Sequence, residues 1–488
     1  MKTNVLQLHF FLILTLFQAV SGIAATGDKQ IPDSAITRAV ETRLASDEMI
    51  DANRFNVITR QGIVTVSGKT DNILEKERIN KVVSTVKGVV AIINQVEVEP
   101  VKRSDAELTK AVTKVLSEDP STHTFHIKVK AKDGVVTLEG STDSWQEKQF
   151  SAQVAKRTPG VRRVINKIDI VYTGKRSDQA IEKDIQARLQ NDAAIDPSLI
   201  IVSVKNGRVI LSGEVGSVAE KERAIEDAWV NGVEMVEIDK LKVSWWIRDK
   251  MRRKNYAQRP ADSQIRKAIE TAFVYDPRVD AEHPKVTVES GNVILTGVVD
   301  NLRAKRAAEA DARNVIGVKS VKNHLKVRPR RIPSADVLAK RIKQAFRNDP
   351  VLAPYKLDVT AISGRVYISG EVNNEFERKM AEVIAARTKG VSSVRNKIVY
   401  APKRWVWKKD WEIKQEIRER YAFNPYLDTK DVKIEVKDGI VTLKGEVKNW
   451  RQRTAAAENA RQAGARAVIN KLRIRHPEEN ATDPSIGF

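Results

Sequence analysis

The stretch Gly62-Ile-Val-Thr-Val-Ser-Gly68 decides how this sequence folds. With Lys69 and Thr70 behind it, the stretch resembles the phosphate loop of nucleotide hydrolases, which reads G-x-x-x-x-G-K-[ST]. Here five residues separate the glycines instead of four, and most of the five are β-branched. Such residues favour a pleated strand over an open loop lined by backbone N–H groups. The stretch is therefore predicted to be a β-strand bounded by two glycines, the first in a turn and the second at the strand end.

The glycine–strand–glycine pattern occurs six times. The paired structural glycines are Gly62/Gly68, Gly134/Gly140, Gly207/Gly213, Gly291/Gly297, Gly364/Gly370 and Gly439/Gly445. Their first members are 72, 73, 84, 73 and 75 residues apart. A fixed period of this size indicates a chain of repeated structural units.

Each copy has the same upstream pattern, which begins with three apolar residues at i, i+4 and i+8. This spacing is typical of one buried helix stripe. The trios are Ile36/Val40/Leu44, Leu108/Val112/Leu116, Ile181/Ile185/Leu189, Ile265/Ile269/Phe273, Leu338/Ile342/Phe346 and Ile413/Ile417/Tyr421. Three residues later comes a polar residue, namely Asp47, Asp119, Asp192, Asp276, Asp349 or Asn424, and proline follows four of them. We interpret this polar series as helix termination rather than acid–base chemistry, because proline cannot continue a helix.

The downstream pattern predicts a hairpin, a second helix and a third strand. Asp133-Gly134 and Asp438-Gly439 have the composition of tight hairpin turns. Four residues after the second glycine comes a good N-cap residue: Asn72, Ser144, Ser217, Asn301, Asn374 or Asn449. Glycine ends the following helix in every copy, and six residues later five copies have Asn94, Asn166, Asn323, Asn396 or Asn470. The third copy departs, with Ile238-Asp239 at that place.

The predicted fold class is therefore α+β, with six tandem αββαβ modules. In each module two helices cover one face of a three-stranded mixed sheet, since the second and third strands are joined through a helix and should be parallel. The predicted boundaries are 31–99, 104–172, 177–244, 261–328, 334–400 and 410–476, with linkers at 245–260 and 401–409 and a disordered tail at 477–488.

The unit resembles the BON domain, a bacterial periplasmic module with an αββαβ order, a G-x-V-x-L-x-G core and a later Gly-Val. The resemblance covers about residues 31–476, and six copies exceed the one to three that family members usually carry. It implies a non-enzymatic envelope protein, linked to osmotic stress or membrane integrity, with anionic phospholipid as the favoured ligand. The family has no catalytic or ligand motif to transfer residue by residue.

The N-terminus and the composition favour an exported protein. An apolar run at 10–17 follows Lys2 and precedes small residues, so 1–25 is predicted to be a cleaved signal peptide. The chain contains no cysteine, and therefore neither a disulfide nor a lipid-bearing cysteine is expected. Its formal net charge of +22 favours polyanionic partners. Export makes nucleic acid an unexpected partner, so periplasmic residence with peripheral membrane association is the expected localisation.

The linkers carry the strongest candidate binding signal, because they combine tryptophans with basic residues. The candidate lipid- or anion-binding residues are Trp245, Trp246, Arg248, Lys250, Arg252, Arg253, Lys254, Lys403, Arg404, Trp405, Trp407, Lys408, Lys409 and Trp411. Tryptophan beside lysine and arginine suits the head-group region of an anionic bilayer. Packing of neighbouring modules against the rings, or stacking of polysaccharide on them, explains the same pattern.

Two further cation series recur on the predicted helices. Lys76, Lys148, Lys221, Lys305, Arg378 and Arg453 lie on the second helices, and Arg38, Lys110, Lys183, Lys267 and Lys340 lie on the first. Either series could display charge to a ligand or form ordinary intramolecular pairs. His123 and His126 lack a third ligand nearby, so no metal, cofactor or catalytic residue is predicted.

The sequence thus predicts a non-enzymatic exported protein that binds anionic phospholipid or another envelope polyanion and supports envelope integrity under osmotic stress. The alternative is a periplasmic scaffold or chaperone-like protein whose modules bind other envelope proteins or polysaccharide. An enzyme with a site assembled only by the fold is a third hypothesis. The sequence leaves the oligomeric state open.

Overall fold

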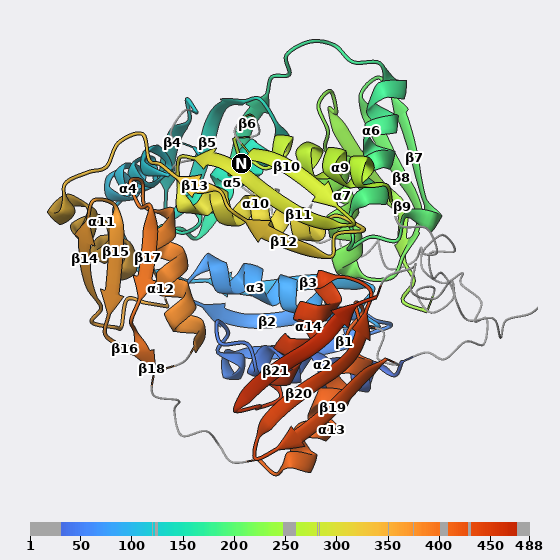
Figure 1. Cartoon of the computed structure of the whole chain (residues 1–488). Coiled ribbons are helices and arrows are strands. Elements are labelled where there is room, and N and C mark those ends of the chain that lie inside the picture. Colours follow the sequence, from blue (N-terminus) through green and yellow to red (C-terminus); the bar gives the residue numbers. More distant parts are fainter. Residues whose placement is uncertain are drawn as a thin grey trace, which may run out of the picture. The chain divides into compact units, whose positions relative to one another are not determined.

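The computed structural model describes residues 31–119, 121–122, 125–246, 260–280, 282, 284–349, 351–373, 375–400, 408–427 and 431–475. The predicted signal peptide and tail lie outside these residues. The described chain repeats one element order six times, and Figure 1 shows this repetition along the colour sequence. We number these repeats modules 1 to 6. The predicted fold class is therefore confirmed.

The first three modules have uninterrupted strands. Module 1 contains α2 (Asp33–Ala45), β1 (Phe55–Arg60), β2 (Ile63–Thr70), α3 (Ile73–Val83) and β3 (Ala91–Val98). Module 2 contains α4 (Asp105–Glu118), β4 (Lys128–Lys132), β5 (Val135–Thr142), α5 (Trp145–Ala155) and β6 (Arg163–Ile170). Module 3 contains α6 (Asp178–Asn191), β7 (Ile200–Lys205), β8 (Arg208–Val215), α7 (Val218–Ala228) and β9 (Met235–Val243).

Modules 4 and 5 have a divided strand, whereas module 6 does not. Module 4 contains α9 (Asp262–Val274), β10 (Pro284–Glu289), β11 (Asn292–Val299), α10 (Leu302–Asn314), β12 (Ser320–Asn323) and β13 (Lys326–Val327). Module 5 contains α11 (Ala335–Asn348), β14 (Asp358–Ile362), β15 (Arg365–Ser369), β16 (Glu371–Val372), α12 (Glu375–Arg387), β17 (Ser393–Asn396) and β18 (Val399–Tyr400). Module 6 contains α13 (Asp410–Ala422), β19 (Val432–Lys437), β20 (Ile440–Val447), α14 (Trp450–Gln462) and β21 (Ala467–Ile474).

Strand pairing follows the predicted pattern. In module 1, β1 pairs antiparallel with β2, and β2 pairs parallel with β3. The same order, with the second strand in the middle, recurs in the other five modules, and in module 5 the divided ends β16 and β18 form a separate two-stranded sheet. Module 3 contains an irregularity between Ile210 and Ser212, where β8 meets β9. This irregularity lies opposite the segment in which the third copy lacks the recurring asparagine.

Each hairpin turn has two consecutive residues at positive φ, as a type I′ turn requires. In module 1 these residues are Gln61 at φ 53° and Gly62 at φ 75°. The Asp33 carboxylate, at the start of α2, accepts the Gln61 N–H at 2.7 Å and the Gly62 N–H at 2.9 Å. Sequence reasoning missed this contact, which Asp178, Asp262 and Asp410 repeat in modules 3, 4 and 6. The turn position predicted for the first motif glycine is confirmed in all modules, with Gly134, Gly207, Gly291, Gly364 and Gly439 also at positive φ.

These turn N–H groups also set the protonation of the aspartate. Hydrogen bonds from Gly207 and Asn206 lower the pKa of Asp178. A carboxyl whose pKa is depressed in the folded state stabilises that state above its unfolded pKa and loses the effect as pH falls. The contact between α6 and its hairpin therefore weakens in acid.

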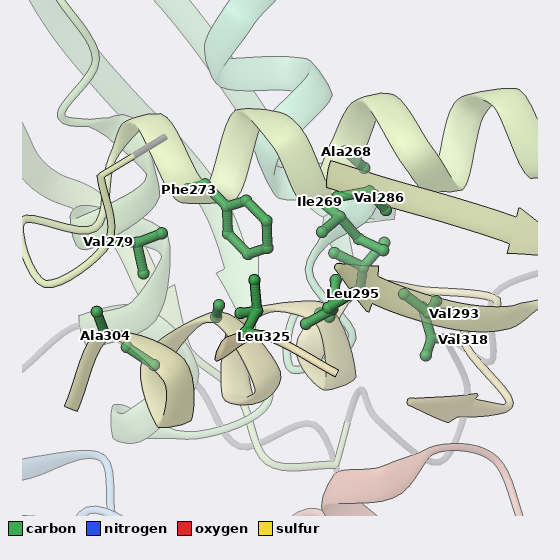
Figure 2. Close-up of a cluster of buried hydrophobic side chains, with 14 of the residues drawn as sticks. Ala268, Ile269, Phe273, Val279, Val286, Val293, Leu295, Ala304, Val318 and Leu325 are labelled. Carbon is green, nitrogen blue, oxygen red and sulfur yellow. The ribbon is translucent and has the colours of Figure 1, made fainter. Parts of the chain in front are cut away.

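The core of each module lies between the helices and one face of the sheet. All six predicted trios are buried, and in module 1 Val40 has no exposed surface. Figure 2 shows the core of module 4, where Phe273 and Ile269 of α9 point toward Leu295 of β11 and Leu325. Burying each such side chain stabilises the fold by about 1.5–3 kcal/mol. The trio is therefore the main contribution that holds the first helix against the sheet.

Five of the six residues that were predicted to end the first helices lie buried at their C-terminal ends, and Asp349 is half-buried. Asp47 accepts the Met49 N–H at 3.1 Å, and Asn424 accepts the Tyr426 N–H at 2.9 Å. The predicted N-caps of the second helices are confirmed in five modules, for instance by the hydrogen bond from the Glu75 N–H to the Asn72 side chain. Asn374 lies outside the described residues.

The second motif glycines do not end the central strand, so the prediction that two glycines bound it is wrong at this end. In five modules the strand continues for two residues past the glycine, namely past Gly68, Gly140, Gly213, Gly297 and Gly445. In module 5 the glycine, Gly370, lies in the one-residue break between β15 and β16. The strand continues because the third strand extends along it. Gly140 pairs with Ile168 and Gly445 with Leu472, each within an unbroken parallel ladder.

Glycine is nevertheless required at this position, because it faces the start of the first strand at close range. Gly213 has φ 102°, and a Cβ built there would lie 1.9 Å from the Leu199 carbonyl oxygen. Built Cβ atoms at Gly140, Gly370 and Gly445 would lie 2.4, 3.0 and 1.9 Å from the carbonyl oxygens of His126, Lys356 and Asp431. Gly297 shares the positive φ, at 116°. The second glycine is therefore a point of close strand approach inside the sheet.

A glycine outside the modules provides the comparison. Gly174, between modules 2 and 3, has φ 87° but no atom within 4 Å of its would-be Cβ. A side chain at position 174 would meet only the cost of positive φ, whereas one at position 213 would also clash with a carbonyl oxygen.

We expect Gly213→Ala to destabilise module 3 more than Gly174→Ala destabilises its surroundings. A positive φ alone costs an alanine about 1–2 kcal/mol, and only position 213 adds overlap with a carbonyl oxygen. Hydrogen exchange of β7 and β8 amides measures the difference. Equal protection in the two variants would contradict the assigned role of Gly213.

Candidate functional site

The recurring cation of the second helix is bound to the third strand in four modules. Lys76 Nζ donates to the Val96 carbonyl at 2.6 Å, and Lys305 Nζ donates to the Leu325 carbonyl at 2.7 Å. Lys221 and Arg453 make the equivalent bonds to Leu241 and Leu472. These side chains therefore fasten the third strand to the helix, which favours the intramolecular interpretation of this series.

The recurring asparagine of the third strand donates a hydrogen bond back to the second helix. Asn94 Nδ2 donates to the Lys76 carbonyl at 2.9 Å, and its Oδ1 accepts the Val96 N–H at 3.1 Å. Asn166, Asn323, Asn396 and Asn470 repeat both contacts. In modules 1, 4 and 6 the cation and the asparagine thus form a reciprocal pair of contacts between helix and strand, which we call the reciprocal lock. Module 3 has no such asparagine, and the strand irregularity described above occurs there instead.

The cations of the first helix behave differently. Arg38, Lys110, Lys183, Lys267 and Lys340 are all exposed. Within the described part of the chain, no ion pair of these five side chains is found. They are therefore available to an anionic partner, in contrast to the cations of the second helix.

Four of the helix-ending aspartates pair with arginines. Asp47 lies 2.6 Å from Arg78, and Asp192 lies 2.5 Å from Arg223. Asp119 pairs at 2.8 Å with Arg303, which belongs to module 4. This pairing adds charge stabilisation to their role at the helix end and leaves them unlike free catalytic acids.

A cavity of 1810 Å³ is lined by α5, α6, α7, α9 and α10. Among its lining residues is Asp227, whose pKa burial raises to about 6, and whose Oδ1 lies 3.0 Å from Arg188. Burial also raises the pKa of Asp311, which faces Arg278 at 3.9 Å. Because each carboxyl has an arginine beside it, the cavity is best described as lined by ion pairs, one between α6 and α7 and one between α10 and the segment after α9.

The linker after module 3 is described only at its first two candidate residues. The Trp245 ring lies 5.0 Å from Lys87 Nζ of module 1 and meets the Trp246 ring edge-on at 6.0 Å. Trp246 is 41% exposed. Trp245 therefore takes part in packing, while Trp246 presents its ring to solvent. Arg248, Lys250, Arg252, Arg253 and Lys254 lie outside the described residues.

The linker before module 6 is described from Lys408 onward. Lys408 Nζ pairs with Glu416 at 2.6 Å, so this cation is engaged within the module. Lys409 is exposed, and its backbone N–H donates to Glu412 at 3.1 Å. Trp411, in the first turn of α13, is 63% exposed. Lys403, Arg404, Trp405 and Trp407 lie outside the described residues.

Three other tryptophans belong to module packing, which the sequence did not reveal. Trp145 stacks on Trp229 with ring centroids 5.4 Å apart, and Gln146 donates to the Trp229 carbonyl at 2.7 Å. Trp450 lies against the guanidinium of Arg313 at 4.9 Å. Trp145 and Trp450 each follow the N-cap of a second helix. This position is the sequence signal that distinguishes them from the linker tryptophans.

Neither a membrane-spanning helix nor a metal-binding cluster occurs in the described part of the chain. None of its helices has the length and apolar character needed to cross a bilayer. Its His, Asp and Glu side chains form no group of three that could hold a metal ion.

The fold and the reciprocal lock define a class of tandem αββαβ modules built on a glycine-containing hairpin. The BON domain family model matches residues 32–100, 104–172, 177–244, 261–329, 334–402 and 409–476. The chain therefore belongs to the BON domain family, and the resemblance drawn from the motifs is confirmed.

Relatives match about two modules of this chain. Osmotically-inducible protein Y of Escherichia coli is 31% identical over 28% of this chain and 70% of its own length. The outer membrane lipoprotein DolP of Haemophilus influenzae is 33% identical over 30% of this chain and 71% of its own length. The C-terminal domain of CdsD, a type III secretion protein of Chlamydia trachomatis, shares 17% identity over 43% of this chain and 96% of its own, with a TM-score of 0.12. A TM-score this low carries no information about function.

We expect Lys305→Met to destabilise module 4 without weakening binding to anionic vesicles. The substitution removes a charged donor from the Leu325 carbonyl, which costs about 1–2 kcal/mol at a half-buried site. Denaturant unfolding and vesicle co-sedimentation measure the two effects. Lys340→Met is the matched control on an exposed first-helix position. Unchanged stability combined with weaker vesicle binding would show that Lys305 is instead displayed to a ligand.

Proposed function

We propose that this chain is an exported, non-enzymatic envelope protein that binds anionic phospholipid surfaces and supports the envelope under osmotic stress. The exposed rings of Trp246 and Trp411, each next to a basic linker, are the observation that carries this proposal. Tryptophan rings favour the head-group depth of a bilayer, and each nearby lysine or arginine adds about 1 kcal/mol on an anionic surface.

Further support comes from the overall charge and from the relatives. The net charge of +22 is joined by exposed first-helix cations on five modules. One relative is named osmotically-inducible, and another is an outer membrane lipoprotein. A secreted chain with these features fits an envelope surface better than a cytoplasmic partner.

The proposed mechanism is multivalent. One exposed cation or ring binds a lipid surface weakly. Because the modules belong to one chain, a module that is bound to a membrane keeps the other modules near the same membrane. The second contact then forms at a high effective concentration, so total avidity exceeds the affinity of any single module. Such binding should weaken steeply with salt, because exposed charges are screened beyond about 10 Å at 0.1 M ionic strength.

Module 1 offers support for the alternative of a scaffold that binds other envelope proteins. Ile58 and Ile93 flank Thr65 on the outer face of its sheet and are 47% and 46% exposed. Neighbouring exposed isoleucines suit a protein partner more than a lipid head group. Crosslinking that recovers a specific envelope protein, in the absence of vesicle binding, would favour this alternative.

We expect the double variant Trp246→Ala/Trp411→Ala to bind phosphatidylglycerol vesicles several times more weakly than the wild type in co-sedimentation at low salt. The control is Val274→Ala/Ile362→Ala, which removes two apolar side chains outside the linkers that are 63% exposed each, at least as exposed as the two tryptophans. Neutral phosphatidylcholine vesicles should bind neither protein. Equal binding of the tryptophan variant and the control, or no binding of the wild type, would overturn the proposal.

A further inference from the structure

The outer face of the module 2 sheet, opposite the helices, is strongly basic. Strand register places Lys132, Val135 and Arg163 in one row, Lys130, Thr137 and Ile165 in the next, and Lys128, Glu139 and Lys167 in the third. Five of these nine side chains are cations and one is an acid. We call these nine residues the module 2 outer face.

The cations of this face are accessible. Lys128, Lys130, Lys132, Arg163 and Lys167 are all exposed, as is the neighbouring Arg162. The acid Glu139 pairs with Lys130 at 2.7 Å. Hydrogen bonding from Lys130, together with the charges of Lys167 and Lys128, lowers the pKa of Glu139. Among the described residues no acidic side chain pairs with the other four cations of the face.

Other modules do not share this concentration of charge. The same nine positions of module 1 are Asn56, Ile58, Arg60, Ile63, Thr65, Ser67, Ala91, Ile93 and Gln95, with one cation. In module 5 the face carries Arg365 and Arg395 beside Thr360, Ile362 and Tyr367. Module 3 carries Lys205, Arg208 and Lys240 beside Glu237. Module 6 comes nearest to module 2, with Lys433, Lys437, Lys444 and Lys471 around Glu435. A basic outer face is therefore a property of particular modules and is not required by the αββαβ fold.

The cations of the face lie on its two outer strands, β4 and β6, with the central strand β5 between them. Alternate residues of a strand are about 6.7 Å apart, and the two outer strands lie about 9.6 Å apart across the central one. Val135 and Thr137 of the central strand, with Ile165 of β6, form the floor of a hollow of 350 Å³, which Lys130, Lys132, Arg162 and the acidic Asp133 border. The face is thus a shallow central strip, apolar at Val135 and acidic at Glu139, with positive charge on both sides.

We propose that the module 2 outer face binds a linear anionic polysaccharide along the central strand β5. Carboxylate or sulfate groups repeated along the polymer would meet Lys128, Lys130 and Lys132 on one side and Arg163 and Lys167 on the other. The carbon-bound hydrogens of the sugar rings would lie over Val135 and Ile165, with the Thr137 hydroxyl between them.

Two features favour this occupant over a bilayer. The nine side chains include no aromatic residue, whereas surfaces that enter the head-group region use tryptophan and tyrosine as anchors. Most of the cations are lysines, which act as mobile point charges, whereas arginine provides the planar fork that suits bidentate capture of a single phosphate. A periodic row of point charges suits a repeating polymer whose groups need not be placed one by one. This inference does not rest on the proposed lipid binding.

The test is titration of the full mature chain with polygalacturonate, followed by calorimetry at low salt, with neutral dextran as the uncharged control. Lys128→Ala/Lys132→Ala should weaken polygalacturonate binding roughly tenfold, given about one order of magnitude for two charge contacts. Arg365→Ala/Arg395→Ala removes the same charge from the outer face of module 5 and should leave the affinity within about twofold of the wild type.

Each other outcome overturns the assignment. Equal weakening by both double variants would mean that binding follows net charge alone. Unchanged affinity in the module 2 variant would place the polymer elsewhere. If the module 2 variant lost binding to phosphatidylglycerol vesicles but kept polygalacturonate binding, the occupant of this face would be the bilayer. Circular dichroism of the variants checks that these exposed substitutions leave the fold intact.

Discussion

The contact on which modules 1, 3, 4 and 6 depend is the pair of hydrogen bonds that the hairpin turn donates to a first-helix carboxylate. Asp178 accepts N–H groups from Asn206 and Gly207, both at positive φ, and so joins α6 to the end of β7 and β8. A one-residue slip of a strand would exchange its core and solvent faces. By fixing the turn, the carboxylate fixes which side chains reach the core and which form the outer face of the sheet.

This sorting of side chains separates structural charge from accessible charge. In four modules the second-helix cation bonds to a third-strand carbonyl, and four of the helix-ending aspartates pair with arginines, so these side chains are not free for a ligand. The accessible cations lie on the first helices and on the outer sheet faces, above all in module 2. The net charge counts the internally bonded cations and the accessible cations alike, although only the accessible cations can bind a polyanion.

Local patterns predicted most of the fold, because helix stripes, caps and turns depend on residues close in sequence. The second motif glycines were wrongly predicted to end their strands, because pairing with a distant third strand extends each ladder past them, as at Gly140. The Asp33 contact was missed because it joins residues 28 and 29 positions apart. The alternating lysines from Lys128 to Lys132 are visible in the sequence, but their neighbourhood with Arg163 and Lys167 follows only from strand register. The linker prediction identified exposed Trp246 and Trp411, whereas Lys408 proved to be engaged within module 6.

Residue-resolved hydrogen exchange of Asp178→Ala against the wild type tests most directly whether the carboxylate holds the turn and the strand register. The amides of Asn206 and Gly207 should lose protection in the variant, and the β7 and β8 amides should follow, while module 1, which keeps Asp33, stays unchanged. Full protection of the module 3 hairpin without the Asp178 carboxylate would contradict the account, since register would then be fixed by the turn glycine and the core alone.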